Sequence, residues 1–142
     1  MAFDNTCFYC TKSEPLDTLM IEVCKLQVST LYLMKDQTHK GRCVVALNDH
    51  KKELFELGED ERCMYMEDIS NVAKALSELF SPDKINYAGY GDGVTHMHFH
   101  VVPKYKGGPE WGNPFSVSLE DKKILSKEEY DERIKLISNK LK

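Results

Sequence analysis

The sequence has no long hydrophobic run and no excess of positive charge. Its longest apolar stretches, such as Cys43–Leu47, are far shorter than the roughly 20 residues that a membrane span needs. Residues 1–12 have no basic segment followed by an apolar one, unlike a secretory signal, so we expect a cytoplasmic protein. Acidic residues outnumber basic ones by 23 to 19, which argues against a nucleic-acid-binding surface. We therefore expect neither a membrane nor a nucleic acid as partner.

Internal repeats, low-complexity tracts and long Gly/Ser linkers are also absent. The chain has 142 residues, 42% of them apolar, which is enough for one core and too little for two ordinary domains. We predict a single domain. The five cysteines are an odd number, which in an apparently cytosolic chain favours thiols or metal ligands over a disulfide framework.

The hydrophobic pattern predicts strands first. Short apolar and β-branched runs over residues 18–23 and 26–34 predict two strands joined by a tight turn near residues 24–25. The run over residues 42–47 is apolar almost throughout, as in a central strand that is covered on both faces.

A long helix and two further strands follow in the pattern. Residues 60–80 carry an apolar stripe at steps of three and four, formed by Met66, Ile69, Ala73, Leu76 and Phe80. Strands are predicted over residues 84–90 and 94–102, around a glycine-rich loop, with Pro103 ending the second. Near the end of the chain, a possible capping box of Ser126 and Glu129 predicts a final helix.

Residues 96–102, with the sequence HMHFHVV, contain three histidines that alternate with apolar residues. Alternate side chains of a strand face the same way, so His96, His98 and His100 should share one surface. The first and third imidazoles would lie about 13 Å apart, which disfavours one ion bound by all three. A half-buried strand whose histidines only meet solvent is the alternative, but three histidines in register favour a functional site.

This alternation resembles the defining motif of the histidine-triad family of hydrolases and transferases. The order of the predicted elements is similar to the family over about residues 5–115, which leaves residues 116–142 as a C-terminal extension of the domain. The resemblance implies an α+β fold with an antiparallel sheet and one long helix, to which the sequence adds a C-terminal helix. It also implies a homodimer.

The resemblance implies that His98 is a nucleophile. It would attack the α-phosphorus of a small nucleotidyl phosphoanhydride, phosphoramidate or phosphoester and form a covalent nucleotidyl-histidine, while His100 contacts the phosphate oxygens. This chemistry is reasonable in itself, because a neutral imidazole is abundant near pH 7 and covalent catalysis divides one displacement into two easier steps. We expect a small nucleotide-like substrate.

Candidate substrate-binding residues are Arg42, Asp92 and Gly93. Backbone N–H groups of the loop at residues 91–93 could stabilise charge on the phosphate, although its glycines are equally consistent with a simple hairpin turn. The loop and its surroundings depart from the family pattern, in which many members have histidine at the position of Arg42 and glutamine at that of Asp92. The acidic residue that binds ribose in many members matches Met34, so weak or altered ribose recognition is expected.

The spacing of Cys7 and Cys10 allows both thiolates to bind one zinc ion, although a single pair of this kind is a weak signal. Some bacterial histidine-triad proteins carry such a pair, and the resemblance implies that His50 and His96 complete a structural zinc (Zn²⁺) site here. The alternative is two ordinary thiols on a mobile terminus.

Two other functions remain open from the sequence. One is a metal-dependent hydrolase, in which His96, His98 and another histidine hold a metal that activates water. The other is a zinc-stabilised binding protein with the same fold but no turnover.

Overall fold

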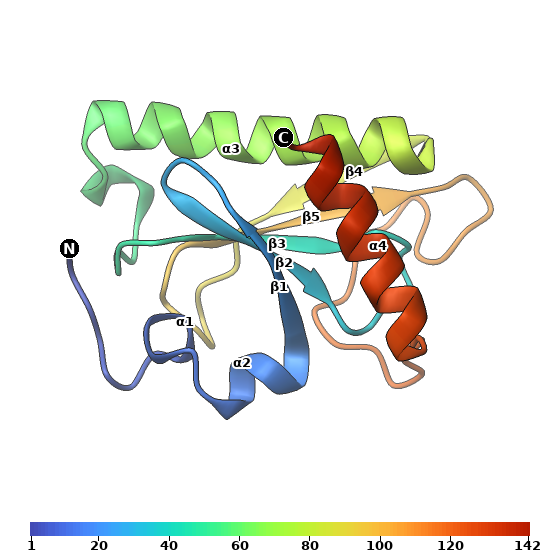
Figure 1. The fold of residues 1–142 in the computed structure, drawn as a ribbon, viewed down its shortest axis with the longest axis horizontal. Helices are drawn as coiled ribbons and strands as arrows, with labels where there is room; N and C mark the ends of the chain where they lie inside the picture. The colour runs from blue at the N-terminus through green and yellow to red at the C-terminus, as the bar shows by residue number, and fades with distance from the viewer.

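One antiparallel sheet of five strands organises the molecule, which a computed structural model describes over residues 1–142 (Figure 1). The strand order is β1-β2-β3-β5-β4. The strands are β1 (Met20–Lys25), β2 (Ser29–Met34), β3 (Cys43–Leu47), β4 (Lys84–Ala88) and β5 (His98–Lys104). The predicted α+β fold is confirmed, with a long helix, α3 (Glu59–Phe80), and a C-terminal helix, α4 (Lys127–Lys140).

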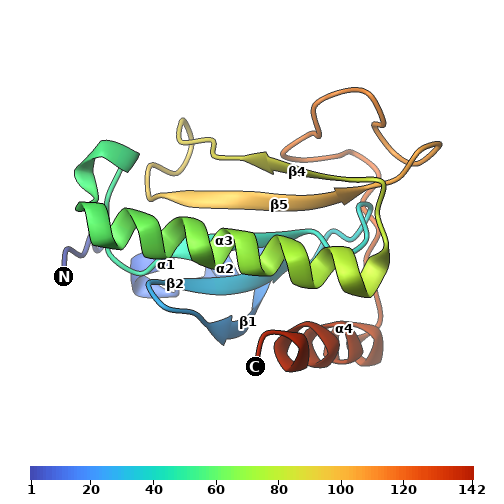
Figure 2. The ribbon, with the colours of Figure 1, turned by 90° about the horizontal axis from the view of Figure 1, so that it is seen from above.

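Helices cover both faces of this sheet. Figures 1 and 2 show α3 and α4 on one face, and the short helices α1 (Phe8–Thr11) and α2 (Glu14–Leu19) on the other. Because side chains of a strand alternate, β2 sends Leu31 and Leu33 into the core beneath α3 and Tyr32 into the core beneath α1. Every residue of β2 and β3 is buried, which explains their nearly continuous apolar sequence.

Helix α3 confirms the predicted element, but its buried stripe differs in part. Ile69, Ala73 and Leu76 are buried as predicted, whereas Met66 is 40% exposed. Tyr65 takes its place in the core, because its hydroxyl donates a hydrogen bond of 2.8 Å to the Val45 carbonyl and so can be buried without an unpaired polar group.

Four boundaries differ from the prediction in the first hairpin and in β5. Residues 18–19 belong to α2, and the first hairpin turns at residues 26–28, where the Asp68 carboxylate accepts hydrogen bonds from the Gln27 and Val28 N–H groups. Strand β5 begins at His98 and continues through Pro103. A proline is tolerated there because pairing with β3 ends at Val101, so β5 has a neighbour on one side only.

The C-terminal helix α4 begins at the predicted capping box. The Glu129 N–H donates to the Ser126 hydroxyl oxygen at 3.2 Å, and the Ser126 N–H donates to the Glu129 carboxylate at 3.1 Å. Ile137 is fully buried in the same core as α3, so this helix is an integral part of the packing. The remaining helical turn is η1 (Leu54–Glu56). None of the helices combines the length and apolar character that crossing a membrane requires.

Candidate functional site

The three histidines lie on the face of the sheet that α1 covers. His98 and His100 are in β5, with ring centroids 5.7 Å apart, and His96 lies two residues before the start of the strand. The Tyr9 ring contacts two of them, with its centroid 5.3 Å from that of His96 and 5.2 Å from that of His98. All three imidazoles are buried, so each ring nitrogen must find a partner in the protein or in a bound ligand.

His98 has one ring nitrogen engaged and one free. Its Nδ1 donates a hydrogen bond of 2.6 Å to the His96 carbonyl, which is the one hydrogen bond of the ring within the protein. Nε2 therefore carries a lone pair. The side chain lines a cavity of about 240 Å³, together with His100, Phe8 and Met34 among others. Burial lowers the pKa of His98, which favours the neutral ring.

His100 lines the same cavity, and its partner is the Arg42 guanidinium. The Arg42 Nη2–H donates to His100 Nδ1 at 3.2 Å. Burial, together with the positive charges of Arg42 and of a protonated His98, lowers the pKa of His100 to about 3. This ring is therefore neutral at physiological pH.

Arg42 is held away from the cavity. It is 1% exposed, donates to the Ser116 carbonyl from Nη1 at 3.0 Å, and stacks its guanidinium 4.9 Å from the centre of the Phe115 ring. It does not belong to the residues that line the cavity. The structure thus brings the predicted Arg42 to His100, and not to the cavity wall.

The other two predicted substrate-binding residues, Asp92 and Gly93, are exposed in the loop before β5. Asp92 lines a second groove that His98 also borders, whereas Gly93 lines neither cavity. A Cβ atom added at Gly91 or Gly93 would meet nothing within 4 Å, so packing does not require glycine at either position.

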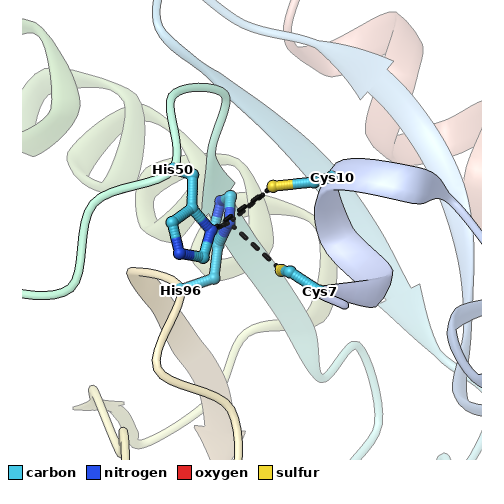
Figure 3. A group of neighbouring side chains, drawn as sticks. All are labelled: Cys7, Cys10, His50 and His96. Atoms are coloured by element: carbon cyan, nitrogen blue, oxygen red, sulfur yellow. Dashed lines mark hydrogen bonds between the residues drawn. The ribbon is translucent and has the colours of Figure 1, made fainter. Parts of the chain in front are cut away.

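The four predicted metal ligands come together at one point (Figure 3). Cys7 and Cys10 come from the turn around α1, His50 follows β3, and His96 precedes β5. Their ligand atoms all lie within 4.8 Å of one another. His50 Nδ1 is 3.1 Å from His96 Nδ1, Cys7 Sγ is 3.5 Å from that nitrogen, and Cys10 Sγ lies 3.3 and 3.6 Å from the two nitrogens.

The four separations of 3.1–3.6 Å are close to those of a tetrahedral metal centre. A zinc ion with two nitrogens at about 2.0–2.1 Å and two sulfurs at about 2.3 Å holds its ligands about 3.3–3.8 Å apart. The bonding of His96 agrees, because its Nε2–H donates to the Leu47 carbonyl and leaves the Nδ1 lone pair facing the cluster. His98 contributes no atom to this group.

Sequence reasoning missed Glu110, which supports the site from the loop after β5. Its carboxylate accepts hydrogen bonds from the Ser116 N–H and hydroxyl and lies 2.7 Å from His39 Nε2. Although burial opposes the shift, the hydrogen bonds from His39 and Ser116 lower the pKa of Glu110 to about 2. No periodic pattern marks this residue, which lies in an irregular loop with a positive φ of 56°.

Comparisons with known proteins identify similar sequences. A family model, the HIT domain, matches residues 22–107. An adenosine 5'-monophosphoramidase of Schizosaccharomyces pombe is 27% identical over 132 residues, which cover 87% of this chain and 95% of the relative. The Protein hit of Bacillus subtilis is 25% identical over 97 residues, or 65% of this chain and 67% of the relative.

Solved structures share the fold. A histidine triad protein from Bradyrhizobium japonicum superposes with a TM-score of 0.83 at 23% identity, covering 92% of this chain and 96% of that one. A zinc-bound histidine triad family protein from Mycobacterium smegmatis superposes with a TM-score of 0.65 at 20% identity, covering 96% and 94%.

Proposed function

The chain belongs to the HIT domain family, and on that premise we propose that it is a nucleotidyl hydrolase or transferase with His98 as nucleophile. The substrate is a small nucleotide-like phosphoanhydride, phosphoramidate or phosphoester. One observation carries the proposal: His98 Nδ1–H is engaged by the His96 carbonyl, which leaves an unpartnered Nε2 lone pair on a side chain that lines a cavity.

The reaction proceeds in two displacements at phosphorus. The Nε2 lone pair forms an N–P bond as the bond from phosphorus to the leaving group breaks, and the leaving group departs with that electron pair and takes a proton from water. The His96 carbonyl stabilises the positive charge that grows on the ring. Water or another acceptor then attacks phosphorus, the N–P electrons return to Nε2, and the acceptor loses its proton to solvent.

His100 supports this reaction by donating a hydrogen bond to a nonbridging phosphate oxygen, where negative charge grows in the transition state. Its position 5.7 Å from the His98 ring, on the same cavity, supports that role. The loop before β5 is proposed to provide further contacts to the substrate through its backbone N–H groups, with Asp92 lining the neighbouring groove. Gly93, which lines neither the cavity nor that groove, would act only if the loop moves toward the substrate.

Ribose recognition is weak in our proposal. Met34 lines the cavity with an apolar side chain. Asp36 also lines the cavity, but its Oδ1 accepts hydrogen bonds from the Thr38 N–H and hydroxyl and from the Lys123 N–H, which leaves only Oδ2 for a ribose hydroxyl. We expect catalytic efficiency for a nucleotide to exceed that for the same phosphate group on a simple ester by less than about a hundredfold, or about 3 kcal/mol. A preference of several orders of magnitude would contradict this expectation.

One structural zinc ion is part of the proposal, and its four ligands are Cys7, Cys10, His50 and His96. Four protein ligands fill a tetrahedral site and leave no position for water, so the metal holds the amino-terminal turn and the segment after β3 against the triad. The tetrahedral fit and the free Nδ1 lone pair of His96 support this assignment.

A covalent adduct tests the function directly. The protein is mixed with adenosine 5'-phosphoramidate, the substrate class suggested by the Schizosaccharomyces pombe relative, and with other nucleotides, quenched at early times and measured by intact mass. We expect an added nucleotidyl mass that is absent from His98→Asn. Turnover without an adduct, abolished by chelation while the melting temperature is unchanged, would favour the metal-dependent hydrolase. Binding without turnover would favour the binding protein.

We also propose a homodimer. Strand β4 forms an edge of the sheet and exposes Tyr87 by 52%, which supports an association there. Light scattering after gel filtration tests the mass, and a monomer at micromolar concentration would refute it.

A further inference from the structure

We propose that Arg42 is a positioning residue that holds His100 in the tautomer with its proton on Nε2, so that His100 presents a hydrogen-bond donor to the substrate. The benefit for the reaction rests on the proposed function, whereas the tautomer itself does not.

The hydrogen-bonding capacity of the Arg42 guanidinium and the His100 imidazole determines the tautomer. A guanidinium has only N–H donors, so the nitrogen that faces it must accept. The Arg42 Nη2 lies 3.2 Å from His100 Nδ1, which therefore carries the lone pair. A neutral imidazole has one proton, and in His100 this proton must then be on Nε2, since the one hydrogen bond of the ring within the protein is made by Nδ1.

Arg42 is fixed in place by contacts with the segment after β5. Its Nη1–H donates to the Ser116 carbonyl at 3.0 Å, and Ser116 is itself held by the Glu110 carboxylate through its N–H at 2.9 Å and its hydroxyl at 2.7 Å. The Phe115 ring packs against the guanidinium. These contacts leave Arg42 1% exposed, so it acts on a substrate only through His100.

His98 and His100 carry their protons on opposite ring nitrogens. The His96 carbonyl draws the proton of His98 to Nδ1, while the Arg42 guanidinium drives the proton of His100 to Nε2. The two rings thus present a lone pair and a donor to one cavity. A phosphoryl group has an electron-poor phosphorus and electron-rich oxygens, and it matches this pair. The opposite tautomer of His100 would set a lone pair against a phosphate oxygen.

Other charged and titratable groups do not replace Arg42. The groups that face His100 are Arg42, His98 and the ring of Tyr90, whose centroid lies 6.3 Å away, and more distant side chains around the cavity are Lys35, Asp36 and Lys122. Only Arg42 has a polar atom within hydrogen-bond distance of the ring.

Histidine nitrogen spectroscopy tests the tautomer without reference to activity. Zinc-loaded protein labelled with ¹⁵N-histidine is examined by two-bond ¹H–¹⁵N correlation, and the His100 signals are assigned by their loss in His100→Asn. We expect an unprotonated Nδ1 and a protonated Nε2 at pH 7. A His100 with its proton on Nδ1 in the parent protein would overturn the inference.

Variants of Arg42 then test the cause. Arg42→Met removes the donor and should give a mixture of tautomers, with kcat reduced about 10- to 100-fold and KM little changed. Arg42→Lys keeps a donor and should restore both the tautomer and most of kcat. Arg62→Met is the matched control, because Arg62 donates to the Leu57 carbonyl and makes no hydrogen bond with Arg42 or His100. We expect it to leave the His100 signals unchanged.

These outcomes separate two kinds of failure. An unchanged Nε2–H tautomer in Arg42→Met, or a tautomer shift with unchanged kcat, would overturn the role of Arg42. A parent protein that has the expected tautomer but turns over no nucleotide would refute the proposed function and leave the tautomer assignment intact. If Arg42→Met does not fold, Arg42→Gln is the second variant, because its amide can accept as well as donate and so no longer imposes the tautomer. We expect a population of His100 with its proton on Nδ1 in this variant, and a pure Nε2–H tautomer would overturn the role of Arg42.

Discussion

His96 and His100 lie two residues to either side of His98, and both are buried, yet the Nδ1 atoms of their rings face different partners. His96 Nδ1 faces two thiols and another imidazole, a group of electron-pair donors that a cation would hold together. His100 Nδ1 faces the guanidinium of Arg42, a cation that belongs to the chain itself. The three histidines share one face of the sheet, yet they have different roles, because the Nδ1 atom of each ring contacts a different partner.

The comparison predicts that His98, between the two, has the largest effect on chemistry. His98→Asn should reduce kcat by about 10⁴-fold or more, because loss of a nucleophile removes the covalent route. The fold should remain, since asparagine retains a donor near the His96 carbonyl. Single-turnover kinetics measures the loss, and circular dichroism checks the fold. Turnover within a few-fold of the parent would show that another group attacks phosphorus.

Loss of the proposed metal should act on stability before chemistry. Cys7→Ser, His50→Ala or chelation should lower the melting temperature by roughly 10 °C, because unfolding would no longer have to release zinc. Calorimetry and metal analysis measure this effect. Cys63→Ser is the matched control, as Cys63 is exposed and lies outside the cluster. Metal-free parent protein, or variants that retain one tightly bound zinc, would contradict the site.

His100→Asn should be milder than His98→Asn, with kcat reduced about 10²-fold, which is typical of the loss of one preorganised donor to a transition state. Substrate affinity should change less. The comparison of kcat and KM for the two variants under identical conditions tests this order. An effect of His100→Asn equal to that of His98→Asn would place both residues in one indispensable unit.

The smallest expected effect is a pH dependence of stability. His100 has a pKa near 6.5 when unfolded and about 3 when folded, so the unfolded chain binds an extra proton between these values. The contribution of the neutral His100 ring to the free energy of unfolding is fully present above pH 6.5 and is lost as the pH falls toward 3. Denaturant unfolding at pH 7, 6 and 5 should show a decline that His100→Asn reduces by up to about 1.4 kcal/mol per pH unit. An identical slope in both proteins would show that His100 is not shifted.

Local patterns predicted the elements that repeat over several turns or residues. The alternation in residues 96–102 placed His98 and His100 on one face, and the long period of α3 identified that helix. The helices α1 and α2 were missed because four and six residues do not complete a recognisable amphipathic period.

Contacts between residues that are far apart in the sequence cannot be predicted from such local patterns. Cys7 and His96 are 89 residues apart, and only the resemblance to a family indicated that they meet. The partners of Arg42 are even harder to predict from the sequence. Two of them are backbone carbonyls 74 and 75 residues later, and because every residue has a carbonyl, residue type does not identify them. The position of an acceptor of this kind depends on the path of an irregular loop, which carries no periodic signal.

The turn between Cys7 and Cys10 has a consequence for redesign. The two residues between the cysteines, Phe8 and Tyr9, both line the cavity beside His98. One wall of the cavity is therefore carried on a short turn whose two ends are held by the cluster, and it is separate from the strand that carries the histidines. Phe8 is only partly buried, so a library at this single position offers a way to alter which groups enter the cavity while the sheet is left unchanged.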